Sequence, residues 1–182
     1  MGRNRGDPAG SAQRREEDQQ RARLIGGDVS ISIRRLDRGD LPSLRIILAG
    51  TGLFPPDMLD AMAEPYLSGE ATHHWLVASD RGPLVAGFAY AEPERMTDGT
   101  FNLLAMAVEP AQQGKRLGKA LVRGLEDLLR EGGGRVLIVE TSSLEEYTGT
   151  RAFYAGQAFC EEARIRDFYA AGEDKILFWK RL

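Results

Sequence analysis

The chain has 182 residues with 24 Lys or Arg and 27 Asp or Glu, giving a formal net charge of −3 at pH 7. This length suits one domain that buries its own core, and the small, well-mixed charge gives no electrostatic case for nucleic acid or an anionic membrane. No apolar run reaches the roughly 20 residues of a membrane span, and no Cys/His cluster or carboxylate spacing indicates a metal site. The sole cysteine, Cys160, is expected to be a small core residue rather than a catalytic thiol. We therefore expect a cytoplasmic protein without a metal.

The N-terminus is predicted to be a tail. From Met1 to about Arg23 there is almost no large apolar residue, so burial cannot offset the entropy of ordering, and the apolar core of a signal peptide is missing. We expect residues 1–28 to be a mobile charged tail and residues 29–182 to be one domain. A short charged helix or a partner-binding arm remains an alternative for the tail.

The domain is predicted to begin with a strand and two helices. Apolar and polar residues alternate over Val29–Ile33, which favours a strand. Asp40 can cap a helix that carries Leu41, Leu44 and Ile47, and Pro55-Pro56 can open a second. The inward positions of that second helix would be Met58, Leu59, Met62 and Ala63.

Three strands follow in the sequence. Residues 75–78 and 84–90 are apolar segments separated by a turn-rich gap, as in an antiparallel pair. Residues 101–108 are almost wholly apolar and end at Glu109-Pro110, which predicts a central strand covered on both faces.

The C-terminal half predicts a βαβ unit and a final strand pair. Residues 115–131 place Leu117, Leu121, Leu125 and Leu128 on one helical face, and three glycines separate this helix from a strand at 136–139. A crossover of this kind makes the strands at 101–108 and 136–139 parallel. A short helix at 150–156 and strands near 162–168 and 175–180 would complete a mixed sheet.

The turn from the central strand to the long helix has the chemistry of a phosphate site. Helix N-termini present free backbone N–H groups with partial positive charge, and Gly114 and Gly118 let an anion approach the main chain. An ordinary strand-to-helix turn is the alternative. Neither GxxxxGK[ST] nor GxGxxG occurs here, so a nucleotide hydrolase or a Rossmann dehydrogenase is unsupported.

The same turn resembles the acyl-CoA signature of the GNAT superfamily of N-acetyltransferases, [RQ]-x-x-G-x-[GA] after a strand that ends in Val-x-Pro. Gln113 and Gly118 match it, Val108-Glu109-Pro110 precedes it, and Arg116 stands at the middle glycine. A second family pattern, A-x-x-F/L-Y-x-x-x-G-F, is similar to residues 150–159, where Tyr154 and Phe159 match and Ala158 replaces the glycine. The resemblance covers about residues 29–182.

The resemblance implies a mostly antiparallel α/β sheet of six to seven strands, flanked by helices, with a splayed parallel strand pair at the acyl-CoA site. It implies acetyl-CoA as the acyl donor, with pantetheine held like an added strand. The residues expected to bind it are Met106, Ala107, Val108, Gln113, Gly114, Lys115, Arg116, Leu117, Gly118 and Lys119.

Family analogy also assigns catalytic roles. Tyr154 would protonate the departing thiolate, and a backbone N–H near Val108 would steady the oxyanion. The general base stays open. The candidates are Glu92, Glu94, Glu140 or a water chain, with His73 and His74 either as a proton relay or as surface residues.

The resulting prediction is an acetyl-CoA-dependent N-acetyltransferase in which a primary amine attacks the thioester directly. A non-catalytic acyl-CoA-binding sensor or regulatory module is the alternative. The acceptor, a small molecule or a peptide amine, is expected against residues 53–66 and the loop at 170–173, and a homodimer is left open.

Overall fold

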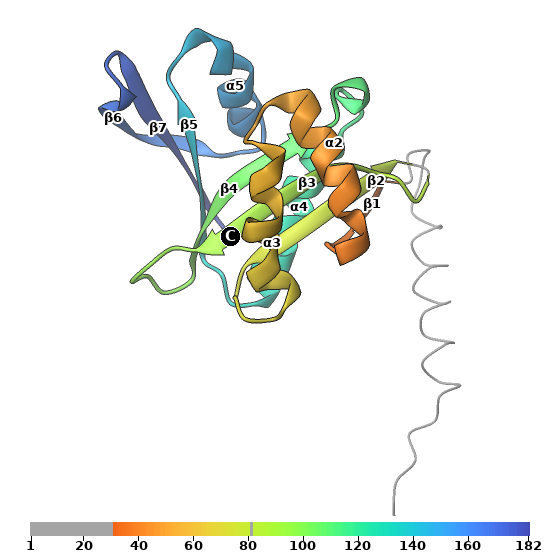
Figure 1. Cartoon of the computed structure of the whole chain (residues 1–182). Helices are drawn as coiled ribbons and strands as arrows, with labels where there is room; N and C mark the ends of the chain where they lie inside the picture. Colours follow the sequence, from red (N-terminus) through yellow and green to blue (C-terminus); the bar gives the residue numbers. More distant parts are fainter. Residues whose placement is uncertain (1–30, 81) are drawn as a thin grey trace, which may run out of the picture. The chain divides into compact units, whose positions relative to one another are not determined.

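The computed structural model describes residues 31–80 and 82–182, so the predicted tail and Val29 lie outside the described residues. Seven strands form one sheet in the order β1-β2-β3-β4-β5-β7-β6 (Figure 1). All neighbours are antiparallel except β4 and β5, which are parallel. This confirms the predicted mixed, mostly antiparallel sheet. The strands are β1 Ile31–Arg35, β2 His74–Asp80, β3 Val85–Pro93, β4 Thr100–Val108, β5 Val136–Ser142, β6 Cys160–Ala170 and β7 Glu173–Arg181.

Two helices, α2 (Leu41–Thr51) and α3 (Leu59–Leu67), follow β1. The prediction that Asp40 caps the first of them with its side chain is wrong. Its carboxylate instead accepts hydrogen bonds from the Arg34 guanidinium, at 2.6 and 2.7 Å, and from the Asp37 amide at 2.8 Å. Met58 is 48% exposed, because it lies in a short 3-10 turn, η2 (Pro56–Met58), before the buried face of α3 begins.

The helices cover both faces of the sheet. Figure 1 shows α2 and α3 in front of the central strands and α4 (Leu117–Glu131) behind them. The apolar stripe of α4 includes Leu117, Leu121, Leu125 and Leu129, all buried. Leu128, which the sequence placed on that face, is only partly buried, because a repeat of four residues from Leu117 leads to Leu129.

The parallel pair of strands separates part of the way along its length. β4 and β5 are paired from Thr100 with Val136 to Leu103 with Val139 and no further. At this point Leu104 bulges out of the β3–β4 ladder, since Tyr90 pairs with Ala105 and Ala91 with Leu103. β5 continues to pair with β7 as far as Ser142. Residues 104–108 of β4 therefore have a strand neighbour only on the β3 side.

The last part of the fold is helix α5 (Thr148–Gly156) and the hairpin of β6 and β7. The Nζ of Lys180, on β7, donates to the Gln157 carbonyl at the end of α5, at 2.7 Å, and to Glu126 of α4. This pair of contacts ties the two helices to the sheet.

The prediction that Cys160 is a core residue is wrong. The residue is exposed on β6, the edge strand, and the neighbouring Phe159 fills the buried position. In the described ranges, none of the helices is long and apolar enough to cross a bilayer.

Candidate active site

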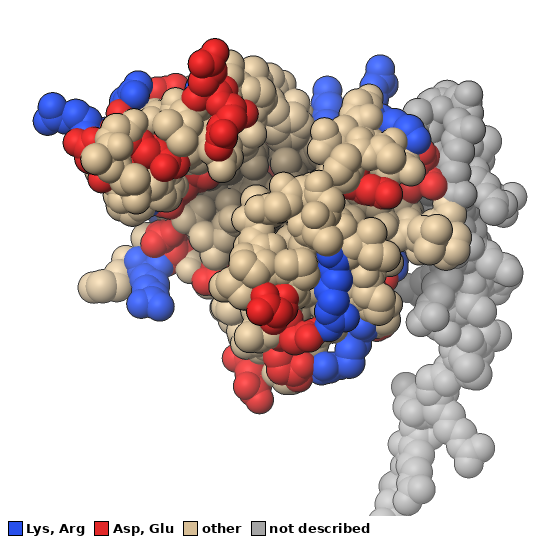
Figure 2. All heavy atoms as spheres, turned by 45° about the horizontal axis from the view of Figure 1, so that its top comes forward, with Lys and Arg blue, Asp and Glu red and all other residues tan. Residues whose placement is uncertain are grey.

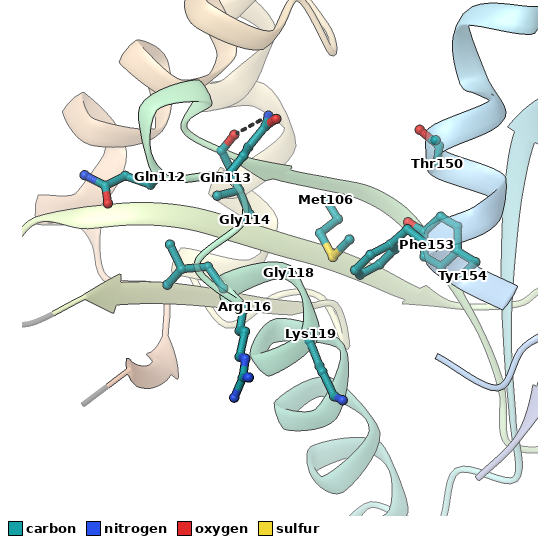
Figure 3. Close-up of a pocket in the computed structure, with 13 residues that line it drawn as sticks. Met106, Gln112, Gln113, Gly114, Arg116, Gly118, Lys119, Thr150, Phe153 and Tyr154 are labelled. Carbon is teal, nitrogen blue, oxygen red and sulfur yellow. Dashed lines mark hydrogen bonds between the residues drawn. The ribbon is translucent and has the colours of Figure 1, made fainter. Parts of the chain in front are cut away.

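A cavity of about 460 Å³ lies between the end of β4, the start of α4 and one side of α5 (Figure 3). Gln113 closes its upper edge by donating from Nε2 to the Val108 carbonyl at 3.2 Å. Phe153 and Tyr154 project from α5 toward Met106 across the cavity. The lining residues are Met106, Val108, Gln112, Gln113, Gly114, Arg116, Leu117, Gly118, Lys119, Gly149, Thr150, Phe153 and Tyr154.

The N-terminus of α4 gives this cavity its positive character. The first backbone bond into the helix runs from the Ala120 amide to the Arg116 carbonyl, so the amides of residues 117–119 precede the intrahelical ladder. The first turn contains no acid, and the cationic side chains of Arg116 and Lys119 lie next to each other beside α4 (Figure 3). Free amides, two cations and the helix dipole together suit phosphate oxygens.

Most of the predicted cofactor-binding residues line this cavity. The exceptions are Ala107, whose side chain packs in the core under α2 and α3, and Lys115, whose Nζ donates to the Gln112 side chain at 2.7 Å. The sequence reasoning missed Gln112, Gly149, Thr150 and Phe153. Helical spacing could have identified Thr150, because it lies one turn before Tyr154 on the same face.

Tyr154 is buried among aromatic rings, with its ring centroid 5.2 Å from Phe153, 5.6 Å from Phe159 and 6.0 Å from Phe178. Burial raises the pKa of its phenol well above the ordinary value of 10. The hydroxyl is therefore protonated at neutral pH.

A second cavity of about 360 Å³ opens where β4 and β5 separate. It shares Met106, Thr150 and Tyr154 with the first cavity, so the two cavities meet at these residues. Two segments that were expected to face an acceptor contribute Leu53 and Glu173. The other lining residues are Leu103, Leu104, Ala105, Val139, Glu140, Thr141, Ser142, Tyr147 and Tyr169.

Of the candidate carboxylates, Glu140 lines the second cavity, and it is ion-paired with Lys175 at 2.7 Å. Glu92 accepts a hydrogen bond from the Tyr90 hydroxyl and lies 3.6 Å from Nε2 of His73. That network and Glu94 line neither cavity.

His74 is also outside both cavities. Its ring packs edge-on against Phe101 with centroids 5.4 Å apart. Burial, then Arg35 and His73, lowers its pKa, so the ring is neutral at pH 7.

Comparison with known proteins agrees with this geometry. The sequence profile of the Acetyltransferase (GNAT) family matches residues 40–159. The chain belongs to the GNAT acetyltransferase family. A GNAT-family protein from Desulfovibrio desulfuricans is 31% identical, with a TM-score of 0.75 over 84% of this chain and 99% of the other.

Two further solved structures share the fold. The ribosomal-protein-S18-alanine N-acetyltransferase of Escherichia coli is 24% identical, with a TM-score of 0.65 over 83% of this chain and 93% of its own. YncA of Salmonella typhimurium, whose structure holds acetyl-CoA, is 22% identical, with a TM-score of 0.65 over 84% of this chain and 94% of its own. No curated protein sequence matches the chain significantly.

The two departures from the GNAT motifs have a common backbone explanation. Arg116 has a φ of 67° and Ala158 a φ of 62°, the left-handed region that glycine enters most easily. The chain thus keeps the backbone shape that the two motif glycines favour and places a side chain on it. At Arg116 that side chain is a guanidinium that lines the first cavity.

Proposed function

We propose that the protein is an N-acetyltransferase that transfers the acetyl group of acetyl-CoA directly to a primary amine. The observation that carries the proposal is the meeting of two cavities at Met106, Thr150 and Tyr154, through the gap between β4 and β5. The first cavity suits a cofactor with phosphates at one end. The second provides a separate entrance for an acceptor, so two substrates can meet without an acyl-enzyme intermediate.

The cofactor fits the residues present. Its pyrophosphate would lie against the amides at the start of α4, with Arg116 and Lys119 as counter-charges. Pantetheine would extend along residues 106–108 of β4, which have no neighbour on the β5 side. Met106, Val108, Gln113, Gly114, Leu117 and Gly118 would form the wall of this channel, with Ala107 contributing backbone groups and Lys115 holding Gln112 in place.

In the reaction, the amine nitrogen forms a bond to the thioester carbonyl carbon, and the carbon–sulfur bond breaks. A β4 backbone N–H near Val108 would stabilise the oxyanion. Tyr154, which burial keeps protonated, would give its proton to the leaving thiolate and would then take up, directly or through water, the proton that the attacking nitrogen loses as the amide forms. An alkylammonium is mostly protonated at pH 7 and must lose a proton first; Glu140 is positioned in the second cavity to take it, directly or through water.

The alternative is a module that binds acetyl-CoA without turning it over. The test is to incubate the protein with acetyl-CoA and a panel of amines, and to measure free thiol and the acetylated amine by mass spectrometry. Amine-dependent thiol release supports the enzyme, whereas tight binding without release by any amine supports the sensor. Because Cys160 is exposed and its thiol would add to the signal of a thiol reagent, a Cys160→Ser variant should serve as the assay protein.

A further inference from the structure

The second cavity carries an uncompensated negative charge. Its lining includes two carboxylates, Glu140 and Glu173, and none of its lining residues is Lys, Arg or His. Glu140 is neutralised by Lys175 at 2.7 Å. Glu173 has no ion-pair partner within the described residues and lies at the first position of β7. Figure 2 shows Asp and Glu side chains along the edge of the hollow beside the lobe formed by α5, β6 and β7.

Two tyrosines complete this end of the cavity. Tyr147, just before α5, and Tyr169, near the end of β6, both line it and are partly exposed. Burial first, and then Glu140, Glu173 and Tyr147, raise the pKa of the Tyr169 phenol, as expected when these groups lie close to each other. Aromatic faces and a carboxylate are the groups that bind alkylammonium ions.

The charge lies away from the point where the two cavities meet. The Tyr154 ring lies 6.0 Å from Phe178, which pairs with Val139 on β5. Glu173 precedes Phe178 by five residues on β7, about 16 Å at 3.3 Å per residue. Tyr154 and Glu173 both line the cavity, so a linear chain of methylene groups with an amine at each end can contact both residues.

From these observations, and resting on the proposed acetyl transfer, we propose that the acceptors are linear alkyl diamines or polyamines. One amine is acetylated beside Tyr154 while a second, still protonated, is held by Glu173 and the rings of Tyr147 and Tyr169. A volume of about 360 Å³ falls in the range of small-molecule pockets. The same negative charge disfavours acceptors that carry a free carboxylate, such as amino acids.

The test compares three acceptors of one chain length: 1,5-diaminopentane, 1-aminopentane and 5-aminopentanoate, each assayed for kcat/KM at low salt. We expect kcat/KM for the diamine to exceed that for the monoamine by about tenfold or more, which is about 1.4 kcal/mol. The amino acid should have the lowest kcat/KM of the three. In Glu173→Gln the ratio of kcat/KM for the diamine to kcat/KM for the monoamine should fall toward one, mainly because the KM of the diamine rises. Glu161→Gln, an equal charge change on the exposed edge strand, should leave the ratio as it is.

The inference is overturned if the wild-type protein does not discriminate between diamine and monoamine, if Glu173→Gln keeps the full preference, or if an N-terminal peptide amine is preferred tenfold. These outcomes leave acetyl transfer itself intact, because thiol release still occurs. If no amine releases thiol, the proposed function fails, and calorimetry of 1,5-diaminopentane on the CoA-loaded protein then decides this inference. Binding that weakens in Glu173→Gln supports the diamine site, and the absence of binding overturns it.

Discussion

Gly118 and Phe153 approach each other across the first cavity. A Cβ built on Gly118 would lie 3.4 Å from both Cε2 and Cζ of the Phe153 ring and 3.9 Å from Cε of Met106. This is ordinary van der Waals contact, so one methyl group fits and a larger side chain enters the cavity in which we propose that the cofactor binds. Gly118 also keeps the backbone open to an anion at the second residue of α4.

Gly118→Val should weaken acetyl-CoA binding by well over tenfold, at least about 1.4 kcal/mol, while the fold persists. Gly118→Ala is the graded control and should lose much less affinity, because its methyl group meets Phe153 at contact distance. Calorimetry measures both, and circular dichroism checks the fold. Unchanged affinity in a folded Gly118→Val protein would remove this turn from the cofactor site.

Tyr154→Phe should separate chemistry from binding. Removing the proton donor is expected to lower kcat by roughly 10²-fold while acetyl-CoA affinity stays within a few-fold. A thioester with a more acidic thiol should reduce this loss of kcat, since departure of its thiolate depends less on protonation. Equal turnover in single-turnover experiments, where product release does not limit the rate, would leave Tyr154 as a packing residue.

The pH profile provides a second check on Tyr154. In the proposed reaction the protonated phenol is the active form, so its contribution to kcat is lost as pH rises through its pKa. Because burial raises that pKa well above 10, kcat should show no decline attributable to this group up to pH 10. A loss of kcat between pH 8 and 9.5 that disappears in Tyr154→Phe would contradict this assignment.

Ala158→Gly should stabilise the protein by about 1 kcal/mol, since it relieves a left-handed residue at the end of α5. For a domain of this size the midpoint of thermal unfolding should rise by about 2–4 °C. The matched control is Ala155→Gly inside the helix, which should destabilise by a similar amount. If both variants change the thermal midpoint in the same direction by the same amount, the backbone conformation at residue 158 is not the cause.

Arg116→Gly should relieve the same strain yet reduce acetyl-CoA affinity several-fold, because the guanidinium is removed from the first cavity. The affinity difference between the two proteins should shrink at high salt. If the glycine variant binds acetyl-CoA as tightly as the wild type, Arg116 has only a structural place in the turn.

Lys180→Ala should lower the free energy of unfolding by about 2–3 kcal/mol, because Glu126, only 5% exposed, loses a buried partner and the Gln157 carbonyl loses its donor. Arg130, the more exposed partner of Glu126, provides the control: Arg130→Ala should cost less than about 1 kcal/mol. Urea denaturation measures both. If the two variants lose similar amounts of unfolding free energy, the buried contact between Lys180 and Glu126 is not the source of the stability.

His74 should make stability sensitive to mild acid. Its pKa is lowered in the folded state, so the unfolded chain binds a proton more readily and stability falls as pH drops below about 6.5. His74→Gln should flatten the decline in thermal midpoint between pH 6.5 and 5. A decline of unchanged steepness would show that other groups cause it.

The sequence by itself determined the order of the elements and the nature of the first cavity. Alternation and helical periodicity depend only on near neighbours, so β3, β4 and α4 could be predicted close to their observed bounds. The turn that we propose binds phosphate is also local: a strand end, two glycines and a helix start lie within one short segment, and Tyr154 follows within a recognisable pattern.

Only the tertiary structure decided the second cavity and the details of the core. Because β7 inserts between β5 and β6, the β6–β7 hairpin brings Tyr169 and Glu173 to Glu140 on β5, residues that no short-range pattern connects. Cys160 is exposed because β6 is the edge strand. Asp40 does not cap its helix because its carboxylate binds Arg34, a residue of β1. Such contacts between distant segments depend on the strand order of the sheet, which side-chain periodicity does not encode.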